Sequence, residues 1–235
     1  MKKGHVVLVT GCNRGIGFAA CENLLSKGHA VIATARDKKK GEQIVKDLKV
    51  KYPKGKIRFI KLDITAQRDV TKCFNQIEKK EGKLDCLVNN AGILYNEDLE
   101  ATTNSQLEKT LQTNLIGPFM MCRKFLPLLR KSKDAKIINV TSQLGSLENS
   151  GIDFAAYRIS KTGLNSLTRT LHFDLKNKKE KIKVFCVCPG WVHTDMGGPS
   201  APRTPAQGAK SILFPFYSKT AKSGSYLQDG KKLPW

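Results

Sequence analysis

Short apolar runs alternate along the chain with longer segments whose apolar residues recur at helical spacing. The runs have strand length and many β-branched residues, and they lie at residues 5–10, 30–35, 57–63, 84–90, 136–142 and 181–190. The segments with helical spacing fill the intervals, at residues 16–28, 40–52, 64–82, 104–132 and 154–180. A loop rich in Gly and Pro then leads to a further helix over 205–219 and a last short strand over 224–231. Continuous apolar strands separated by helices indicate a parallel sheet that is covered on both faces. We therefore predict an α/β fold with a doubly wound, mostly parallel seven-stranded sheet, in a single domain over residues 1–235.

The turn after the first apolar run is rich in glycine. Residues 10–17 read TGCNRGIG. Glycines permit a tight turn and close approach of a ligand, and the first N–H groups of a helix are unpaired donors that favour phosphate. The spacing G-x-x-x-G-x-G is neither the Walker spacing nor the usual dinucleotide fingerprint. A tight turn without a ligand is the alternative, but three glycines between a strand and a helix fit it poorly.

Tyr157 and Lys161 form a second pattern, in the sequence YRISK. Positions i and i+4 lie on one helix face, so the ammonium group should lie beside the phenol. A nearby cation favours the phenolate, and we expect it to lower the pKa of Tyr157 toward a value usable for proton transfer near neutrality. Two unrelated surface residues would give the same spacing, so this pair alone does not establish a site.

Several motifs together resemble the short-chain dehydrogenase/reductase family, and they follow that family's order over nearly the whole chain. They are TGCNRGIG at 10–17, NNAG at 89–92, Asn114 in the next long helix, Ser142 after the fifth strand, YRISK at 157–161 and PGWVHT at 189–194. Each motif is weak or moderate by itself, whereas all of them in register are a specific signal. The resemblance implies a Rossmann fold, a bound dinucleotide and a carbonyl reductase-like activity.

The resemblance also implies a role for each of four residues. Tyr157 would be the general acid that protonates a carbonyl oxygen, and Lys161 would lower its pKa and bind the nicotinamide ribose. Ser142 would hydrogen-bond the substrate oxygen, and Asn114 would hold a water that links Lys161 to solvent. The implied cofactor-binding residues are Gly11, Asn13, Arg14, Gly15, Ile16, Gly17, Arg36, Asp63, Ile64, Asn89, Ala91, Gly92, Tyr157, Lys161, Pro189, Gly190, Val192 and Thr194. A serine-hydrolase interpretation with Ser142 and His193 lacks the G-x-S-x-G turn.

The end of the second apolar run bears on the choice of dinucleotide. An acid there bonds the adenosine ribose of NAD, whereas an arginine accommodates the 2′-phosphate of NADP. Ala35 stands at the position of the acid, and Arg36 follows it. We expect Arg36 and Arg14 to clamp the 2′-phosphate and Asp37 to turn away, which predicts NADP(H) as the cofactor. The alternative is a solvated Arg36 that pairs with Asp37.

Charge and cysteine usage bear on partners and location. Lys and Arg number 41 against 20 Asp and Glu, a net charge of +21. The lysines are spread through loops and helix backs without a nucleic-acid-binding motif, so we expect a solvated basic surface and no nucleic acid partner. The apolar runs are too short for a membrane-spanning helix, so no membrane insertion is expected. Seven scattered cysteines without a CxxC pair, and no signal-peptide pattern, predict reduced thiols, no metal site and a cytoplasmic location.

We therefore expect an NADPH-dependent oxidoreductase that reduces a small-to-medium ketone or aldehyde to the alcohol. The candidate substrate wall is mostly apolar or aromatic and comprises Tyr95, Leu144, Leu147, Asp153, Phe154 and residues 191–196. The insertion that precedes the catalytic tyrosine of some monomeric carbonyl reductases is absent, so the resemblance implies a homodimer or homotetramer paired through the helices at 103–131 and 154–177. The alternative is an NADP-binding regulatory or signalling protein of the same fold that acts through partners.

Overall fold

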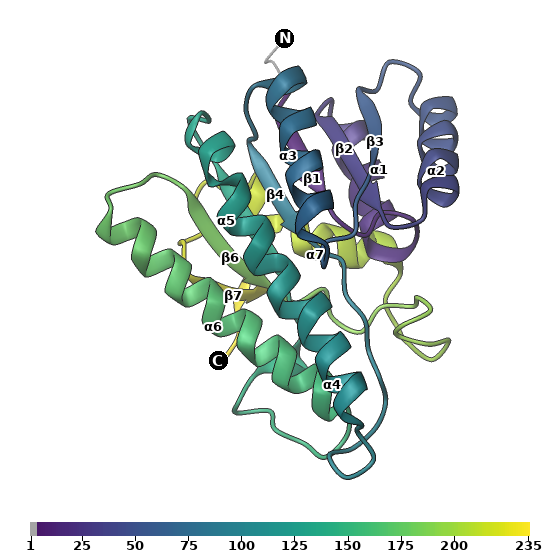
Figure 1. Ribbon diagram of the computed structural model, residues 1–235, viewed down its shortest axis with the longest axis vertical. Coiled ribbons are helices and arrows are strands. Elements are labelled where there is room, and N and C mark those ends of the chain that lie inside the picture. The colour runs from purple at the N-terminus through teal and green to yellow at the C-terminus, as the bar shows by residue number, and fades with distance from the viewer. Residues whose placement is uncertain (1–3) are drawn as a thin grey trace.

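The computed structural model describes residues 4–235, in which eight strands form one sheet (Figure 1). The order across the sheet is β3-β2-β1-β4-β5-β6-β7-β8, and every neighbouring pair is parallel except β7 and β8. The strands are β1 (Val6–Val9), β2 (Ala30–Ala35), β3 (Ile57–Lys61), β4 (Cys86–Asn89), β5 (Lys136–Val140), β6 (Lys183–Val187), β7 (Ser225–Gln228) and β8 (Lys231–Lys232). Residues 1–3 of the predicted domain lie outside the described part of the chain.

The predicted doubly wound, mostly parallel sheet is confirmed, but the predicted number of seven strands is wrong. The single strand expected over 224–231 is a hairpin in which β7 and β8 pair antiparallel. Asp229 and Gly230 form the turn, and both have positive φ, 50° and 82°. Asp-Gly is a preferred sequence for two-residue hairpin turns, since both positions need left-handed backbone. That dipeptide is the sequence signal for the eighth strand.

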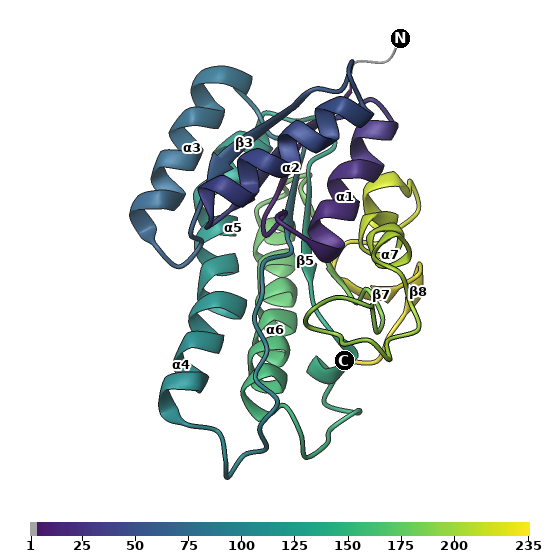
Figure 2. The same cartoon turned by 90° about the vertical axis from the view of Figure 1, so that its right-hand side faces the viewer.

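Helices cover both faces of the sheet (Figure 2). One face carries α1 (Gly15–Ser26), α2 (Lys38–Lys51) and α7 (Pro205–Tyr217); the other carries α3 (Gln67–Glu81), α5 (Gly117–Arg130) and α6 (Ala155–Asn177), with α4 (Asn104–Leu111) extending below α5. A π-helical stretch, Gln112–Ile116, joins α4 to α5. The long helix expected over 104–132 is therefore interrupted in its middle.

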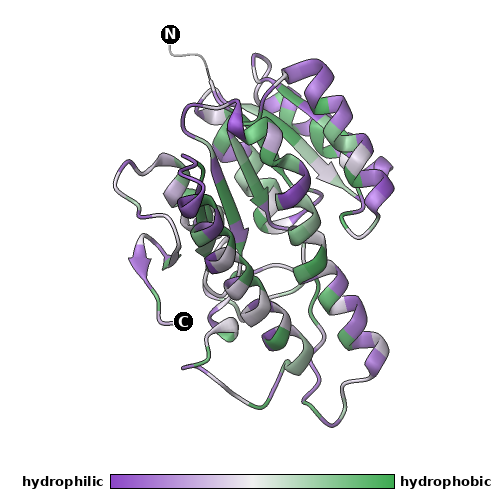
Figure 3. Cartoon of the chain, turned by 60° about the vertical axis from the view of Figure 1, so that its left-hand side comes forward, coloured by the Kyte–Doolittle hydropathy of each residue, from purple (hydrophilic) through white to green (hydrophobic). Residues whose placement is uncertain are grey.

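The strands fill two separate cores because successive side chains point to opposite faces. Val7 and Val9 of β1 pack with α1 and α7, whereas Leu8 between them packs with α3 and α5. Figure 3 shows these apolar strands enclosed by helices whose outer faces are polar. Burial on both faces explains why the strands read as continuous apolar runs in the sequence.

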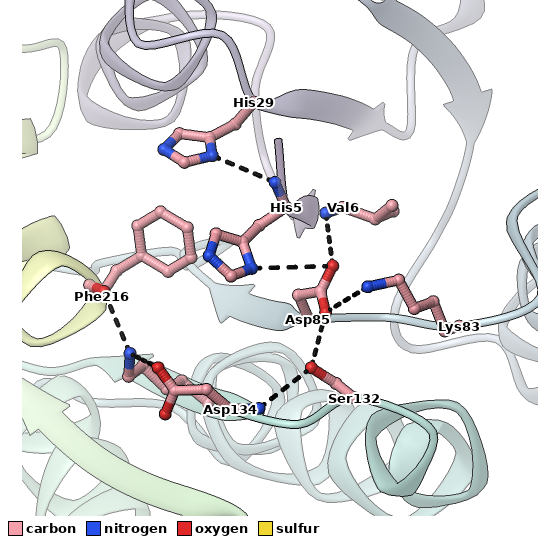
Figure 4. A network of polar contacts seen from close by, with 9 residues as sticks. His5, Val6, His29, Lys83, Asp85, Ser132, Asp134 and Phe216 are labelled. Carbon is pink, nitrogen blue, oxygen red and sulfur yellow. Dashed lines mark hydrogen bonds and ion pairs between the residues drawn. The ribbon is translucent and has the colours of Figure 1, made fainter. Parts of the chain in front are cut away.

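A polar network ties the amino ends of β1, β4 and β5 together (Figure 4). Asp85 is 2% exposed and accepts hydrogen bonds from Val6 N at 2.8 Å, Ser132 Oγ at 2.5 Å and Lys83 Nζ at 2.8 Å. Lys136 donates to the carbonyl oxygen at residue 216, near the end of α7, at 3.1 Å. The network therefore stabilises the edge of the sheet opposite the carboxyl ends of the strands.

Three further features of residues 4–235 concern membranes, metals and thiols. None of their helices combines the length and the apolar character that a membrane crossing requires. They hold no group of three or more His, Cys, Asp or Glu side chains placed to bind a metal ion. All seven cysteines are free and buried.

Candidate active site

A cleft of about 480 Å³ opens at the carboxyl ends of β1 to β5. In an open parallel sheet, ligands bind at this edge, where the strand order reverses, and here that point lies between β1 and β4. The glycine turn after β1 and the NNAG segment after β4 contribute to its walls, and Tyr157 and Lys161 of α6 line it as well. The topology therefore gathers the sequence motifs around one cavity.

The glycine turn between β1 and α1 is shaped for a phosphate. Gly11 and Gly15 have left-handed backbone, with φ of 69° and 58°, and a Cβ on Gly11 would lie 2.9 Å from Ala91 Cα. Helix α1 has no side-chain cap on its first turn and no acidic residue there. Its first N–H groups, in residues such as Ile16 and Gly17 that line the cleft, thus lack a competing acceptor from a capping side chain.

Hydrogen bonds join the glycine turn to the NNAG segment. Thr10 Oγ1 accepts bonds from the backbone nitrogens of Asn90 and Ala91, both at 3.0 Å. The Asn90 side chain donates to the backbone oxygens of Thr10, at 2.8 Å, and Gly11, at 3.1 Å. The segments after β1 and β4 therefore form one continuous wall.

Three of the four predicted catalytic residues meet where β5 and α6 approach each other. Tyr157 is 7% exposed, and the nearby Ser142 side chain acts to lower the pKa of its phenol. Lys161 lies one helical turn further on, with its Nζ 5.4 Å from the centre of the Tyr157 ring. The same Nζ donates to the Val140 carbonyl oxygen at 2.9 Å. A phenol and an ammonium group therefore reach the same cavity, with the Ser142 hydroxyl beside the phenol.

Burial is the largest influence on the pKa values of Tyr157 and Lys161. It raises the pKa of Tyr157 above its ordinary value, and the neighbouring Ser142 hydroxyl lowers that pKa only part of the way back. Burial also lowers the pKa of Lys161 to about 8. The expected lowering of the Tyr157 pKa by Lys161 is not found, since the ammonium group bonds the Val140 carbonyl and faces the ring instead of the hydroxyl. Tyr157 consequently keeps its proton at neutral pH.

Asn114, the fourth predicted residue, lies in the π-helical stretch and is fully buried. Its side chain accepts a bond from Ile93 N at 2.9 Å and donates to Ile93 O at 2.8 Å. A Cβ on Gly92 would lie 3.3 Å from Asn114 Oδ1 and 3.7 Å from Lys161 Nζ. Asn114 therefore holds the chain after the NNAG segment beside Lys161, and the glycine leaves the space between them open.

The positively charged residues that the structure places at the cleft differ from the predicted pair, Arg14 and Arg36. Arg36 lines the cleft after β2, and Lys40, in the first turn of α2, lines it too. Asp37 caps α2, with its carboxylate accepting a bond from Lys40 N at 3.0 Å. Arg14 also lines the cleft, but its guanidinium pairs with Asp195 on the loop after β6. Lys40 is thus a cation of the cleft that sequence reasoning missed, and Arg14 is engaged by an acid that it did not foresee.

Most residues predicted to bind the cofactor line the cleft: Gly11, Asn13, Arg14, Ile16, Gly17, Arg36, Asp63, Ile64, Ala91, Gly92, Tyr157, Lys161, Pro189 and Thr194. Gly15, Asn89, Gly190 and Val192 lie outside the lining, as do Asn114 and Ser142. Asn89 departs furthest from expectation, being 3% exposed and donating to Asn139 Oδ1 at 2.8 Å. As the last residue of β4, paired with Asn139 of β5, it belongs to the sheet interior. Its neighbour Asn90 lines the cleft instead.

The wall residues that sequence reasoning missed lie close to predicted ones. They are Ala35, Lys40, Leu62, Thr65, Asn90, Ile93, Thr113, Val140 and Thr141, and Asp37, expected to turn away, lines the cleft as well. Most stand within two residues of a predicted position, so proximity to the carboxyl end of a strand is the signal that finds them. Of the expected substrate wall, Thr194 and Met196 line the cleft, whereas Tyr95, Asp153 and Phe154 do not. Leu144 and Leu147 line a separate pocket of about 310 Å³.

Comparison with known proteins gives matches over most of the chain. The family model described as short chain dehydrogenase matches residues 5–204. Carbonyl reductase [NADPH] 1 of Mus musculus is 31% identical over 276 residues, covering 98% of each chain. The NADPH-bound carbonyl reductase from chicken fatty liver has a TM-score of 0.89 at 29% identity, covering 99% of this chain and 100% of its own. The carbonyl reductase Sniffer of D. melanogaster has a TM-score of 0.88 at 32% identity, with the same coverage.

Proposed function

This chain belongs to the short-chain dehydrogenase family, and we propose that it is an NADPH-dependent reductase of a small-to-medium ketone or aldehyde. One observation carries the proposal. Tyr157, buried, protonated and close to Ser142, lines a cleft whose other wall is a glycine turn shaped for a phosphate. A protein that only binds a nucleotide has no need of a proton donor at that place. The names of the mouse and chicken relatives support the same class of reaction.

The chemistry assigns each side chain a task. When bound, NADPH would supply the hydride. Negative charge then develops on the carbonyl oxygen of the substrate, and the hydroxyl groups of Tyr157 and Ser142 stabilise it as hydrogen-bond donors. Tyr157 gives its proton to that oxygen. Lys161, with a pKa of about 8, is cationic below that pH, and its ammonium group lines the cleft, where it would bind the nicotinamide ribose.

The residues of the cleft fit a phosphorylated dinucleotide. The uncapped start of α1 suits a pyrophosphate, and Asp63 and Ile64 line the cleft after β3, where they would contact the adenine. Arg36 and Lys40 supply two positive charges on the wall after β2. The position of the acid that would bind an unphosphorylated ribose holds Ala35. These features favour NADPH over NADH.

Assembly and location are part of the same proposal. The exposed apolar residues Ile116, Phe119, Ile159 and Phe173 lie on the π-helical stretch, α5 and α6. Pairing of two copies through these helices would remove that apolar surface from water. We therefore keep the predictions of a homodimer or homotetramer and of a cytoplasmic location.

The test is the oxidation of NADPH, followed by its near-ultraviolet absorbance, with a panel of aldehydes, ketones and diketones. Tyr157→Phe should lose activity by about 100-fold or more, because the proton donor is removed. Tyr217→Phe is the matched control, since the Tyr217 hydroxyl bonds Asn23 Oδ1 at 2.9 Å on the face formed by α1 and α7. Equal rates for wild type and Tyr157→Phe would contradict the catalytic assignment. NADPH binding without turnover of any carbonyl would favour a regulatory protein.

A further inference from the structure

We propose that Tyr226 and Trp235 are positioning residues that hold Ser142 in place for the reaction. The proposal rests on the proposed function, because it assigns these residues to the same chemistry. Tyr226 belongs to β7, and Trp235 follows β8, so both come from the carboxyl-terminal hairpin region and not from the motifs. Neither is among the residues that line the cleft. They therefore act through the backbone of the segment that contains Ser142.

Tyr226 fixes the carbonyl group of Ser142. The ring is 1% exposed, and its Oη donates to Ser142 O at 2.6 Å across 84 positions of sequence. The same oxygen accepts a bond from Gly145 N at 2.9 Å, which closes the short 3₁₀ turn at Gln143–Gly145. The bond from Gly145 N lies within the turn and does not fix the turn relative to the rest of the protein. The bond from Tyr226 does, because it joins the turn to β7 of the sheet.

Trp235 holds the other end of the same segment. Its carbonyl oxygen accepts bonds from Ser146 Oγ and Leu147 N, both at 3.1 Å. Its ring lies 5.5 Å from the Tyr226 ring, and the Arg169 guanidinium lies 5.2 Å from it. In Figure 2 the end of the chain lies beside the short turn that follows β5. The hairpin region, residues 225–235, thus holds the segment 142–147 by hydrogen bonds at both of its ends.

Helix α6 restrains the opposite side of this segment. Thr141 Oγ1 donates to Asn165 Oδ1 at 2.8 Å, and Asn165 Nδ2 donates to Gly145 O at 3.0 Å. A Cβ on Gly145 would lie 2.8 Å from the backbone carbonyl carbon of Lys161, so the segment packs tightly against α6 at Gly145. Helix α6 also carries Tyr157. The bond from Tyr226 and the bonds from α6 therefore fix the position of Ser142 relative to the proton donor.

The position of Ser142 matters because its hydroxyl must meet the charge that develops on the substrate oxygen. A misplacement of about 1 Å in such a group can cost about 100-fold in rate. Tyr226→Phe keeps the buried ring and removes only the bond to Ser142. The Ser142 carbonyl retains its bond from Gly145 N, so the loss should be partial.

The kinetic test compares Tyr226→Phe with the matched control Tyr217→Phe. Tyr226→Phe should lower kcat about threefold to tenfold without changing the Kd of NADPH, and the control should match wild type. In a Ser142→Ala background the same substitution should have no further effect on kcat, because the group that it positions is gone. A purely structural role would give the same loss in both backgrounds, and that result would overturn the proposal.

Hydrogen exchange separates this proposal from the proposed function. Amides of residues 143–148 should exchange faster in Tyr226→Phe than in wild type or Tyr217→Phe. The same is expected of Trp235→Ala, which removes the ring that packs on Tyr226 and Arg169 and so loosens the Trp235 carbonyl. If wild type reduced no carbonyl, the proposed function would fail, and the exchange rates alone would show whether the hairpin region holds the segment. Unchanged exchange in both variants overturns the proposal. Faster exchange with an unchanged kcat in an active enzyme overturns it as well.

Discussion

The Asp37 carboxylate accepts a hydrogen bond from the backbone nitrogen of Lys40 at 3.0 Å and thereby caps α2. Asp37 also lines the cleft, so it does not turn away from it as expected, but its Oδ1 is engaged as the cap of the helix. Arg36 and Lys40 both line that cleft. The acid next to Arg36, which would otherwise weaken a phosphate site, is therefore engaged by the helix.

Substitution of these cations should change the preference for the cofactor. Arg36→Ala and Lys40→Ala should each lower the ratio of kcat/KM for NADPH to that for NADH, by about tenfold or more for Arg36, whose fork binds phosphate bidentately. Lys39→Ala is the control, since Lys39 is exposed and lies outside the cleft lining. An unchanged ratio for Arg36→Ala would show that the 2′-phosphate is not bound there.

Arg14 provides a second prediction about the cofactor. Its ion partner Asp195 stands on the loop after β6, and the two side chains are 68% and 66% exposed. An exposed pair contributes only about 0–1 kcal/mol to stability, so Asp195→Ala should leave the Tm nearly unchanged. Removal of the acid frees Arg14 for a phosphate, and the Kd of NADPH should fall about twofold to fivefold at low salt. Asp47→Ala, with the same change in net charge, should not tighten binding; equal Kd values for wild type and Asp195→Ala would count against this role.

The sequence allowed the order of strands and helices, and the edge that holds the site, to be predicted, because burial on both faces of the sheet imposes continuous apolar runs. The direction in which a side chain points at the end of a strand was harder to predict from the sequence. Asn89 and Asn90 are neighbours, and only the pairing of β4 with β5 decides that Asn89 points to Asn139 and Asn90 to the cleft. Arg14 meets Asp195 across 181 positions, a contact that no local pattern contains.

The pKa of Lys161 predicts how the reaction depends on pH. Burial lowers this pKa to about 8, so the ammonium group is charged below that pH and loses its proton above it. The pKa of Tyr157 is raised, so the phenol remains a proton donor over the same range. For carbonyl reduction, kcat/KM should therefore be constant below about pH 7 and decline as the pH rises through about 8. A profile that stays flat to about pH 10 would show that the charge of Lys161 is not required.

We expect Asp85, which lies within the polar network of Figure 4, to control the acid stability of the edge opposite the cleft. Burial alone would raise its pKa, but hydrogen bonds from Lys83, Ser132 and Val6 N lower it below its usual value. A carboxyl group with a lowered native pKa contributes stability above its unfolded pKa, and that contribution is lost as the pH falls through the native value. Asp85→Asn should lower the free energy of unfolding at neutral pH by about 2–4 kcal/mol and flatten its dependence on pH below about 4. Asp174→Asn, an exposed i,i+4 partner of Lys178, should change it by less than about 0.5 kcal/mol. Denaturant unfolding across this pH range measures both effects, and an Asp85→Asn protein with the wild-type pH dependence would exclude Asp85 as the responsible group.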